Sequence, residues 1–194
     1  PTALKHKDGP AAAFHEMAIN VHPCVMEIRK MRKPVIAAIN GVAAGGGFSL
    51  SLAADFRIID EDAIMKLGFT SNGLSVDAAG TFNLPRLVGQ AKALEIATFD
   101  EPINAIEAKE LGLVTEISKK GESVEASVLF AKRIFEKSLN TFGWSKQLIN
   151  SSFENTIETQ MEREHQALVD CVSHPDGYEG LRAFVEKRRP HYNK

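Results

Sequence analysis

A short apolar run followed by a glycine triplet constrains the fold of this chain more than any other feature. Residues 34–40 (PVIAAIN) are apolar almost throughout, which is typical of a strand covered on both faces. The triplet at residues 45–47 leads into residues 48–55 (FSLSLAAD), which predict the start of a helix, and residues 56–59 (FRII) predict a second strand. Strands that alternate with helices in this way indicate an α/β layer arrangement.

Helical patterns lie on both sides of this core. Residues 11–31 carry apolar residues at helical spacing, and Pro23 predicts a kink. Residues 77–98 predict two helical pieces that break near Pro85 and Gly89.

The chain changes composition near residue 120, from a mixed pattern to an all-helical and charged one. We therefore expect an α/β core in residues 1–120 and a C-terminal helical region in residues 121–194. In the second region, helices are expected at about 122–137, 143–153, 156–173 and 176–187.

Composition excludes several classes of protein. The net charge of −2, from 23 basic and 25 acidic residues, makes nucleic acid a poor partner. No apolar run approaches the roughly 20 residues of a membrane helix. Cys24 and Cys171 are far apart, which predicts reduced thiols in a cytoplasmic protein, and the six histidines lack metal-ligand spacing. The first residue is not Met, so we expect a segment upstream of Pro1.

The glycine triplet has chemical as well as structural meaning. Unpaired N–H groups at a helix start can hold a phosphate or an oxygen that becomes negative during reaction. The triplet lacks the Lys-Ser/Thr ending of a P-loop and the GxGxxG spacing of a dinucleotide site, which favours the oxyanion. A tight turn needed only for packing is the alternative.

Four segments together resemble the enoyl-CoA hydratase/isomerase (crotonase) family in order and spacing. They are residues 33–58 (KPVIAAINGVAAGGGFSLSLAADFRI), 73–96 (GLSVDAAGTFNLPRLVGQAKALEI), 104–117 (NAIEAKELGLVTEI) and 180–192 (GLRAFVEKRRPHY). The resemblance implies an α/β fold with a ββα-spiral core and a C-terminal helical trimerisation region. It also implies acyl-CoA thioester substrates of fatty acid metabolism, no cofactor beyond the coenzyme A of the substrate, and a homotrimer or hexamer.

The family's binding residues can be carried onto this chain. The N–H of Gly46 would hold the thioester oxygen, with Ala44 and Gly45 beside the substrate. The second N–H donor of the family comes from an AGxD-like segment, which we expect upstream of Pro1. Phe184 and Lys187 match positions that contact coenzyme A from a neighbouring subunit; the alternative is a charged helix end.

The acid and base groups of the family's hydratases are missing. Hydratases use two glutamates, whose positions here are Ser49 and Phe69, and neither residue is a general acid or base of that kind. Phe69 is expected either as a wall of the acyl pocket or in the core. Ser49 is expected to make room for substrate or to be a hydroxyl on the helix surface.

Asp77 is the carboxylate that the family's isomerases and aryl-CoA dehalogenases place at or near this point. Beside Val76, which we expect to contact the substrate, and two alanines, it should lie in an apolar pocket that raises its pKa. It could then move a proton between two carbons of an enolate. The alternative is a helix N-cap.

The resemblance therefore favours an enoyl-CoA isomerase with Asp77 as proton shuttle. Two alternatives stay open. One is another reaction of the family, namely hydration, hydrolysis or dehalogenation of an acyl-CoA. The other is a non-catalytic member that binds coenzyme A or acts as a scaffold.

Overall fold

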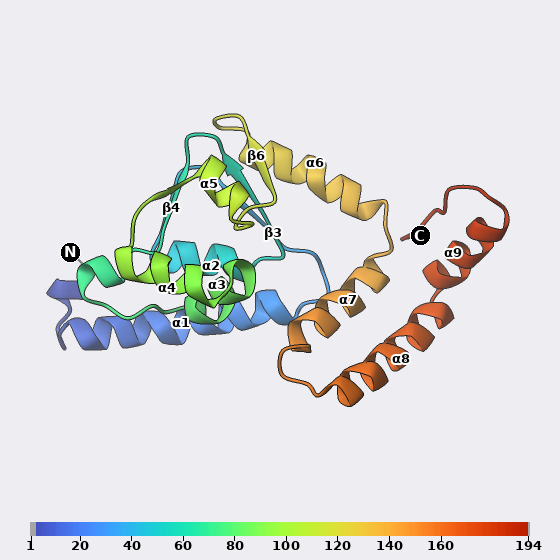
Figure 1. Ribbon diagram of the computed structural model, residues 1–194, viewed down its shortest axis with the longest axis horizontal. Coiled ribbons are helices and arrows are strands. Elements are labelled where there is room, and N and C mark those ends of the chain that lie inside the picture. Colours follow the sequence, from blue (N-terminus) through green and yellow to red (C-terminus); the bar gives the residue numbers. More distant parts are fainter. Residues whose placement is uncertain (1–2, 194) are drawn as a thin grey trace. The chain divides into compact units, whose positions relative to one another are not determined.

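The computed structural model describes residues 3–193, which divide into two compact units (Figure 1). The first unit contains residues 3–29 and 35–127, and the second contains residues 30–34 and 128–193. No helix within residues 3–193 has the length and apolar character needed to cross a membrane.

The first unit is built on two small sheets. One is parallel, with strand order β1-β3-β6, and comprises β1 (Ile36–Ile39), β3 (Phe56–Asp60) and β6 (Glu116–Ser118). The other has the order β2-β4-β5 and comprises β2 (Val42–Ala44), β4 (Ile64–Lys66) and β5 (Ile103–Asn104). β2 pairs with β4 in parallel and β5 pairs with β4 antiparallel. The glycine triplet thus follows directly after the end of β2.

Helices and short 3-10 turns complete the first unit. They are η1 (Ala3–Lys5), α1 (Pro10–Lys30), α2 (Gly46–Ala53), η2 (Thr70–Asn72), α3 (Gly80–Val88), α4 (Gln90–Phe99) and α5 (Ala105–Glu110). In Figure 1, the long α1 runs below α2, α3 and α4. The largest side chains that the core buries completely include Phe48, Ile59 and Met65, from α2, β3 and β4.

The second unit is helical. Its elements are the C-terminal part of α6 (Ser123–Phe135), followed by α7 (Leu139–Ser151), α8 (Ile157–Ser173) and α9 (Pro175–Val185). Ser138, Thr156 and His174 each cap the following helix, because their side chains accept a hydrogen bond from a first-turn N–H.

Most expected elements are confirmed, with two differences. Pro85 lies inside α3 and does not break it; only Gly89, with φ +79°, separates α3 from α4. Pro85 is the sixth of the nine residues of α3 and removes a single ladder bond, which packing against α2 and α4 offsets. β2 was not expected, because three residues between glycines carry little local signal and depend on pairing with β4.

An acidic cluster at Asp55, Asp60, Glu61 and Asp62 predicts a solvated turn, yet Asp60 is buried. Its Oδ1 accepts bonds from the Ser123 N–H at 2.8 Å and the Ser118 hydroxyl at 2.9 Å, and its Oδ2 accepts one from the Gly121 N–H at 2.8 Å. Burial alone would raise the pKa of Asp60, but these hydrogen bonds lower it below its usual value. Asp60 thus ties β3 to the start of α6.

We expect Asp60→Asn to lower the free energy of unfolding by at least about 2 kcal/mol, because the amide NH₂ would face an N–H donor. Since the native pKa is lowered, the stabilisation is present above about pH 4 and is lost as the pH falls further. Denaturant unfolding at several pH values measures both effects. The exposed Asp62→Asn is the matched control, and equal stability of the two variants would contradict this role.

Candidate active site

The glycine turn before α2 has a backbone that only glycine adopts easily. Gly45 has φ +58° and ψ −124°, and its N–H donates to the Lys66 carbonyl at the end of β4 at 3.2 Å. Gly46 is the first residue of α2, so its N–H has no carbonyl acceptor within the helix. Gly46 is also exposed. The turn therefore presents the Gly46 N–H as a fixed hydrogen-bond donor at the positive end of a helix.

A second turn packs directly against the first. A Cβ on Gly68, which has φ +71°, would lie 2.9 Å from the Gly45 nitrogen, so only glycine fits here. The carboxylate of Asp100 is buried and accepts from the Gly68 N–H at 2.6 Å and the Ser71 N–H at 3.0 Å. Burial would raise the pKa of Asp100, but these bonds and the charge of Lys66 lower it. Asp100 thus ties the second turn to the end of α4.

Asp77 faces α1. A small apolar cluster, in which Val25 of α1 packs with Ala53 of α2 and with Ala78, fixes α1 beside the Asp77 loop. This packing places the His22 Nε2 2.8 Å from the Asp77 Oδ1. Both side chains are about half exposed, at 53% for His22 and 49% for Asp77. The two residues form a hydrogen-bonded acid–base pair that is open to a ligand.

The pKa of Asp77 differs from expectation. Burial raises it, but hydrogen bonds from the Ala78 N–H and from His22, together with the charge of His22, outweigh burial and lower the pKa below its usual value. The prediction that an apolar pocket raises the pKa of Asp77 is therefore wrong, because the carboxylate is half exposed and hydrogen-bonded. Asp77 is ionised at neutral pH and can act as a base in the free protein.

The helix-cap alternative for Asp77 is not observed. α3 begins at Gly80 with Ala79 in the N-cap position, and no side chain in the described part of the chain caps it. Ala78 and Ala79 both have positive φ, at +53° and +60°, an uncommon conformation for residues with a Cβ. Backbone strain of this kind clusters at functional sites, and here it directly follows the carboxylate.

The side chains at the two positions where hydratases carry glutamate, Ser49 and Phe69, are both buried. Ser49 is completely buried, and its hydroxyl has no hydrogen-bond partner within the described chain. A Cβ on Gly80 would lie 2.5 Å from that hydroxyl oxygen, so α3 and α2 are in close contact here. Phe69 is buried and belongs to the hydrophobic core. The surface alternative for Ser49 is therefore wrong.

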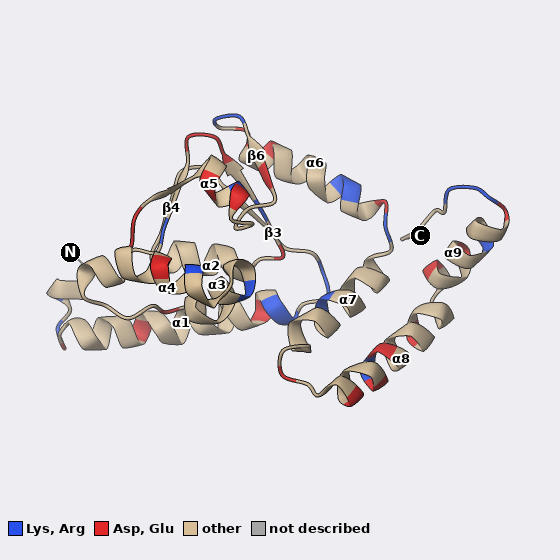
Figure 2. Cartoon of the chain, viewed as in Figure 1, with Lys and Arg blue, Asp and Glu red and all other residues tan. Residues whose placement is uncertain are grey.

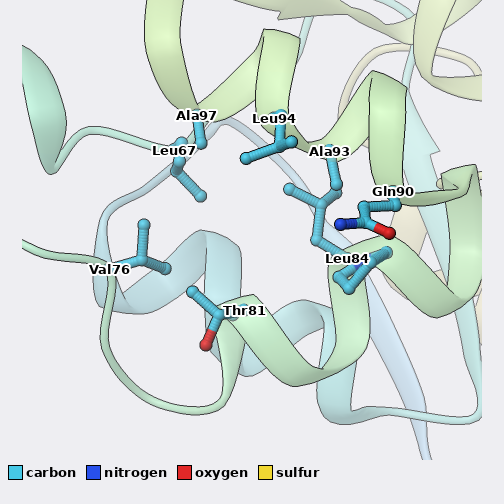
Figure 3. Close-up of a pocket in the computed structure, with 10 residues that line it drawn as sticks. Leu67, Val76, Thr81, Leu84, Gln90, Ala93, Leu94 and Ala97 are labelled. Carbon is cyan, nitrogen blue, oxygen red and sulfur yellow. The ribbon is translucent and has the colours of Figure 1, made fainter.

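An apolar cavity of about 410 Å³ opens in the first unit (Figure 3). Residues of the β4–α3 connection, α3 and α4 line it, among them Leu67, Val76, Thr81, Leu84, Gln90 and Ala97. Val76 was expected to contact the substrate, and it lies in this wall next to Asp77. Phe69 does not line this cavity.

Three further residues were expected at the site, namely Ala44, Phe184 and Lys187. Ala44 is the last residue of β2 and is exposed. Phe184, which is 84% exposed, and Lys187 lie in the second unit, at and just after the end of α9. Figure 2 shows the basic stretch that follows α9. Contact of these two residues with coenzyme A stays a prediction.

His22 is the site residue that sequence reasoning missed. It lies 55 residues before Asp77, and no local pattern pairs the two. Within residues 3–193, no three His, Cys, Asp or Glu side chains gather as metal ligands would.

Comparison with known proteins gives the family. The family model described as "Enoyl-CoA hydratase/isomerase" matches residues 5–194. A protein named "Probable enoyl-CoA hydratase" from Bacillus subtilis (strain 168) is 39% identical over 166 residues, which are 85% of this chain and 64% of that protein. The 1,2-epoxyphenylacetyl-CoA isomerase of Escherichia coli (strain K12) is 35% identical over 173 residues, which are 88% of this chain and 65% of that protein.

A solved structure supports the same family assignment. The crystal structure of an enoyl-CoA hydratase from Bacillus anthracis matches with a TM-score of 0.86 and 35% identity, over 93% of this chain and 70% of that one. The chain therefore belongs to the enoyl-CoA hydratase/isomerase family and has the crotonase fold, as its motifs indicate. It spans 64% and 65% of the length of the two relatives above.

Proposed function

We propose that this protein shifts a double bond in an enoyl-CoA thioester, with Asp77 as the proton carrier. The observation that carries the proposal is the distribution of carboxylates. Asp77 is ionised, open and paired with His22 at 2.8 Å. The positions of the two hydratase glutamates hold the buried Ser49 and Phe69 instead. A site with one carboxylate suits movement of a proton better than addition of water, for which the family's hydratases use two.

The proposed reaction needs one base and one oxyanion donor from this chain. The Asp77 carboxylate takes a proton from the α carbon of a 3-enoyl-CoA, and the electron pair spreads onto the thioester oxygen. The Gly46 N–H donates a hydrogen bond to that oxygen, which becomes negative in the dienolate. Asp77 returns the proton to the γ carbon, so the double bond moves into conjugation and nothing is consumed or released.

Further features of the family are proposed with this activity. The substrate is an acyl-CoA thioester, and the helices α6–α9 supply an oligomerisation surface. Phe184 and Lys187 contact coenzyme A, where a lysine ammonium would act as a point charge on a phosphate.

Two substrates test the proposed reaction. A 3-enoyl-CoA should gain the ultraviolet absorbance of a conjugated thioester with no change in mass, while a 2-enoyl-CoA should gain no water. A protein that adds the mass of water to 2-enoyl-CoA, and forms no conjugated product from 3-enoyl-CoA, would be a hydratase.

The pH dependence of the reaction should report the His22 contact. With its pKa lowered, Asp77 stays ionised in the free protein as the pH falls to about 4, the usual range of such a group. His22→Ala removes a hydrogen bond and a positive charge, so the pKa of Asp77 rises. We expect the acidic limb of the kcat/KM profile to move to higher pH in this variant. An unchanged limb would mean that His22 does not act on the base.

One observation favours a second function. The contact of His22 with Asp77 places a base beside a carboxylate, as dehalogenation of an aryl-CoA would require. There, Asp77 would attack the ring carbon and halide would leave. His22 would then take a proton from the water that hydrolyses the aryl ester and restores the carboxylate. Release of halide from a halogenated benzoyl-CoA distinguishes the two reactions.

A further inference from the structure

Asp100 is a buried carboxylate at a position where the backbone favours glycine. It is the C-cap of α4, with φ +49° and ψ +41°, a left-handed conformation that glycine and asparagine adopt most readily. Its side chain belongs to a residue that is only 3% exposed. The end of α4 requires neither the charge nor the burial, so the role of the carboxylate lies in the groups that it binds.

Both carboxylate oxygens of Asp100 bind the turn at residues 67–73. Oδ1 accepts a hydrogen bond from the Gly68 N–H at 2.6 Å, and Oδ2 accepts one from the Ser71 N–H at 3.0 Å. A third bond joins the same turn to α4, because the Thr70 hydroxyl donates to the Ala97 carbonyl at 2.6 Å. The turn is therefore tied to α4 by three hydrogen bonds, two of which end on a charged acceptor.

Gly68 connects this turn to the glycine turn before α2. A Cβ on Gly68 would lie 2.9 Å from the Gly45 nitrogen and 3.4 Å from the Gly45 Cα, so the two backbones are in direct contact. Gly45 itself donates to the Lys66 carbonyl at 3.2 Å, and its own carbonyl accepts from the Ser49 N–H at 3.1 Å. Because the C=O and N–H of a trans peptide point in opposite directions, the bond to Ser49 turns the Gly46 N–H away from α2.

We propose that Asp100 is a positioning residue for the oxyanion donor, the Gly46 N–H. Acting through Gly68, it keeps Gly45 in the conformation that aims this N–H at the thioester oxygen. This inference rests on the proposed function for the presence of a thioester at the glycine turn. It adds that the oxyanion contact is controlled from α4, by a residue that does not touch the substrate.

The direction of the donor is the reason that this restraint matters. An oxyanion donor contributes most when its direction is fixed before reaction, because no reorganisation then accompanies the build-up of charge. Glycine restricts its own backbone less than any other residue, so the conformation of Gly45 at φ +58° depends on its neighbours. Release of Gly68 would let the peptide between Gly45 and Gly46 rotate, and the hydrogen bond to the thioester oxygen would weaken.

The test observes the oxyanion contact itself. Butanoyl-CoA labelled with carbon-13 at its thioester carbonyl is bound to the protein, and the C=O stretch is measured by isotope-edited infrared difference spectroscopy. A well-aimed donor draws electron density toward the oxygen and should lower the stretching frequency below its value in water. Asp100→Gly allows the same backbone conformation but lacks the carboxylate, so we expect most of this decrease to be lost.

Kinetics give a second measurement of the same variants. Asp100→Gly should lower kcat about tenfold, less than the loss of about 10²–10³ for a missing donor. The KM for a 3-enoyl-CoA should stay unchanged, because the contact strengthens only as the oxygen becomes negative. Asp100→Asn keeps one oxygen for the Gly68 N–H, so its frequency and kcat should lie between those of the wild type and Asp100→Gly.

Two further variants separate positioning from stability. Asp60→Asn is the matched control for Asp100→Asn, since it also places an amide where a buried carboxylate accepts N–H donors. It should lower stability but leave the carbonyl frequency and kcat of the folded protein unchanged. Thr70→Val guards against a folding defect, because Thr70 is exposed and the change removes its bond to the Ala97 carbonyl. We expect a smaller change of frequency in the same direction as in Asp100→Gly.

The outcomes for Asp100 and for the proposed reaction are separable. If Asp100→Gly loses the decrease in frequency but the wild type converts no 3-enoyl-CoA, the positioning role is supported and the proposed isomerisation fails. If 3-enoyl-CoA is converted while folded Asp100→Gly keeps the wild-type frequency, the reaction is supported and the positioning role is overturned.

The remaining outcomes also decide the positioning role. If Asp100→Gly does not fold, a wild-type frequency in both Asp100→Asn and Thr70→Val overturns it. An equal change of frequency in Asp60→Asn overturns it as well, because a loss of stability alone would then move the carbonyl. A wild-type complex with the carbonyl frequency of free butanoyl-CoA overturns both the Gly46 donor and this inference.

Discussion

Asp77→Asn should lower kcat for the double-bond shift by a factor of about 10²–10⁴, the range that general acid–base groups contribute. The amide keeps the size of the carboxylate but cannot accept and return a proton. Because the Asp77 side chain is half exposed and does not cap α3, we expect the variant to fold normally.

Affinity separates this catalytic role from a binding role. The dissociation constant of a saturated acyl-CoA should change little in Asp77→Asn, since the thioester oxygen is held by the Gly46 N–H. Asp8→Asn, at an exposed turn, serves as the control. A variant that keeps wild-type turnover would exclude Asp77 as the base. A wild-type protein that binds acyl-CoA but converts none would support the non-catalytic alternative.

Gly45→Ala should have the second large effect. A side chain at φ +58° and ψ −124° is strained, at a cost of about 1–3 kcal/mol, and relief of that strain would rotate the peptide that carries the Gly46 N–H. Loss of one oxyanion donor lowers kcat by about 10²–10³. We therefore expect lower stability together with lower kcat, measured by denaturant unfolding and steady-state kinetics.

Gly41→Ala is the matched control for this variant. Gly41 lies in the turn between β1 and β2, has open space around a Cβ and lacks a positive φ, so alanine should be tolerated. The oxyanion role of the turn would be contradicted if both variants kept the wild-type kcat while Gly45→Ala alone was destabilised.

Local features were predictable from the sequence because the forces that fix them are local. The glycine triplet marked the turn before α2, and the apolar runs marked β1 and β3. The position of Asp77 near the start of α3 also followed from the order of the motifs. Its environment did not, since hydrogen bonds from the Ala78 N–H and from His22 decide its pKa.

The contacts that organise the site join residues far apart in the chain. His22 reaches Asp77 only because α1 packs on α2, and Asp100 reaches the Gly68 N–H across 32 residues. Neither pair has a periodicity or a short motif that could be read along the chain. The burial of Asp60 was missed for the same reason, because its hydrogen-bond donors come from the segment at residues 118–123.

Product masses from 3-enoyl-CoA incubated in deuterium oxide enriched in oxygen-18 test the central claim most directly. The wild type and Asp77→Ala are compared in the same solvent. Proton transfer by Asp77 predicts a product with a shifted double bond and no oxygen-18, and loss of this product in the variant. Oxygen-18 in a product that Asp77→Ala still forms would contradict the account, because water would then be added without this carboxylate.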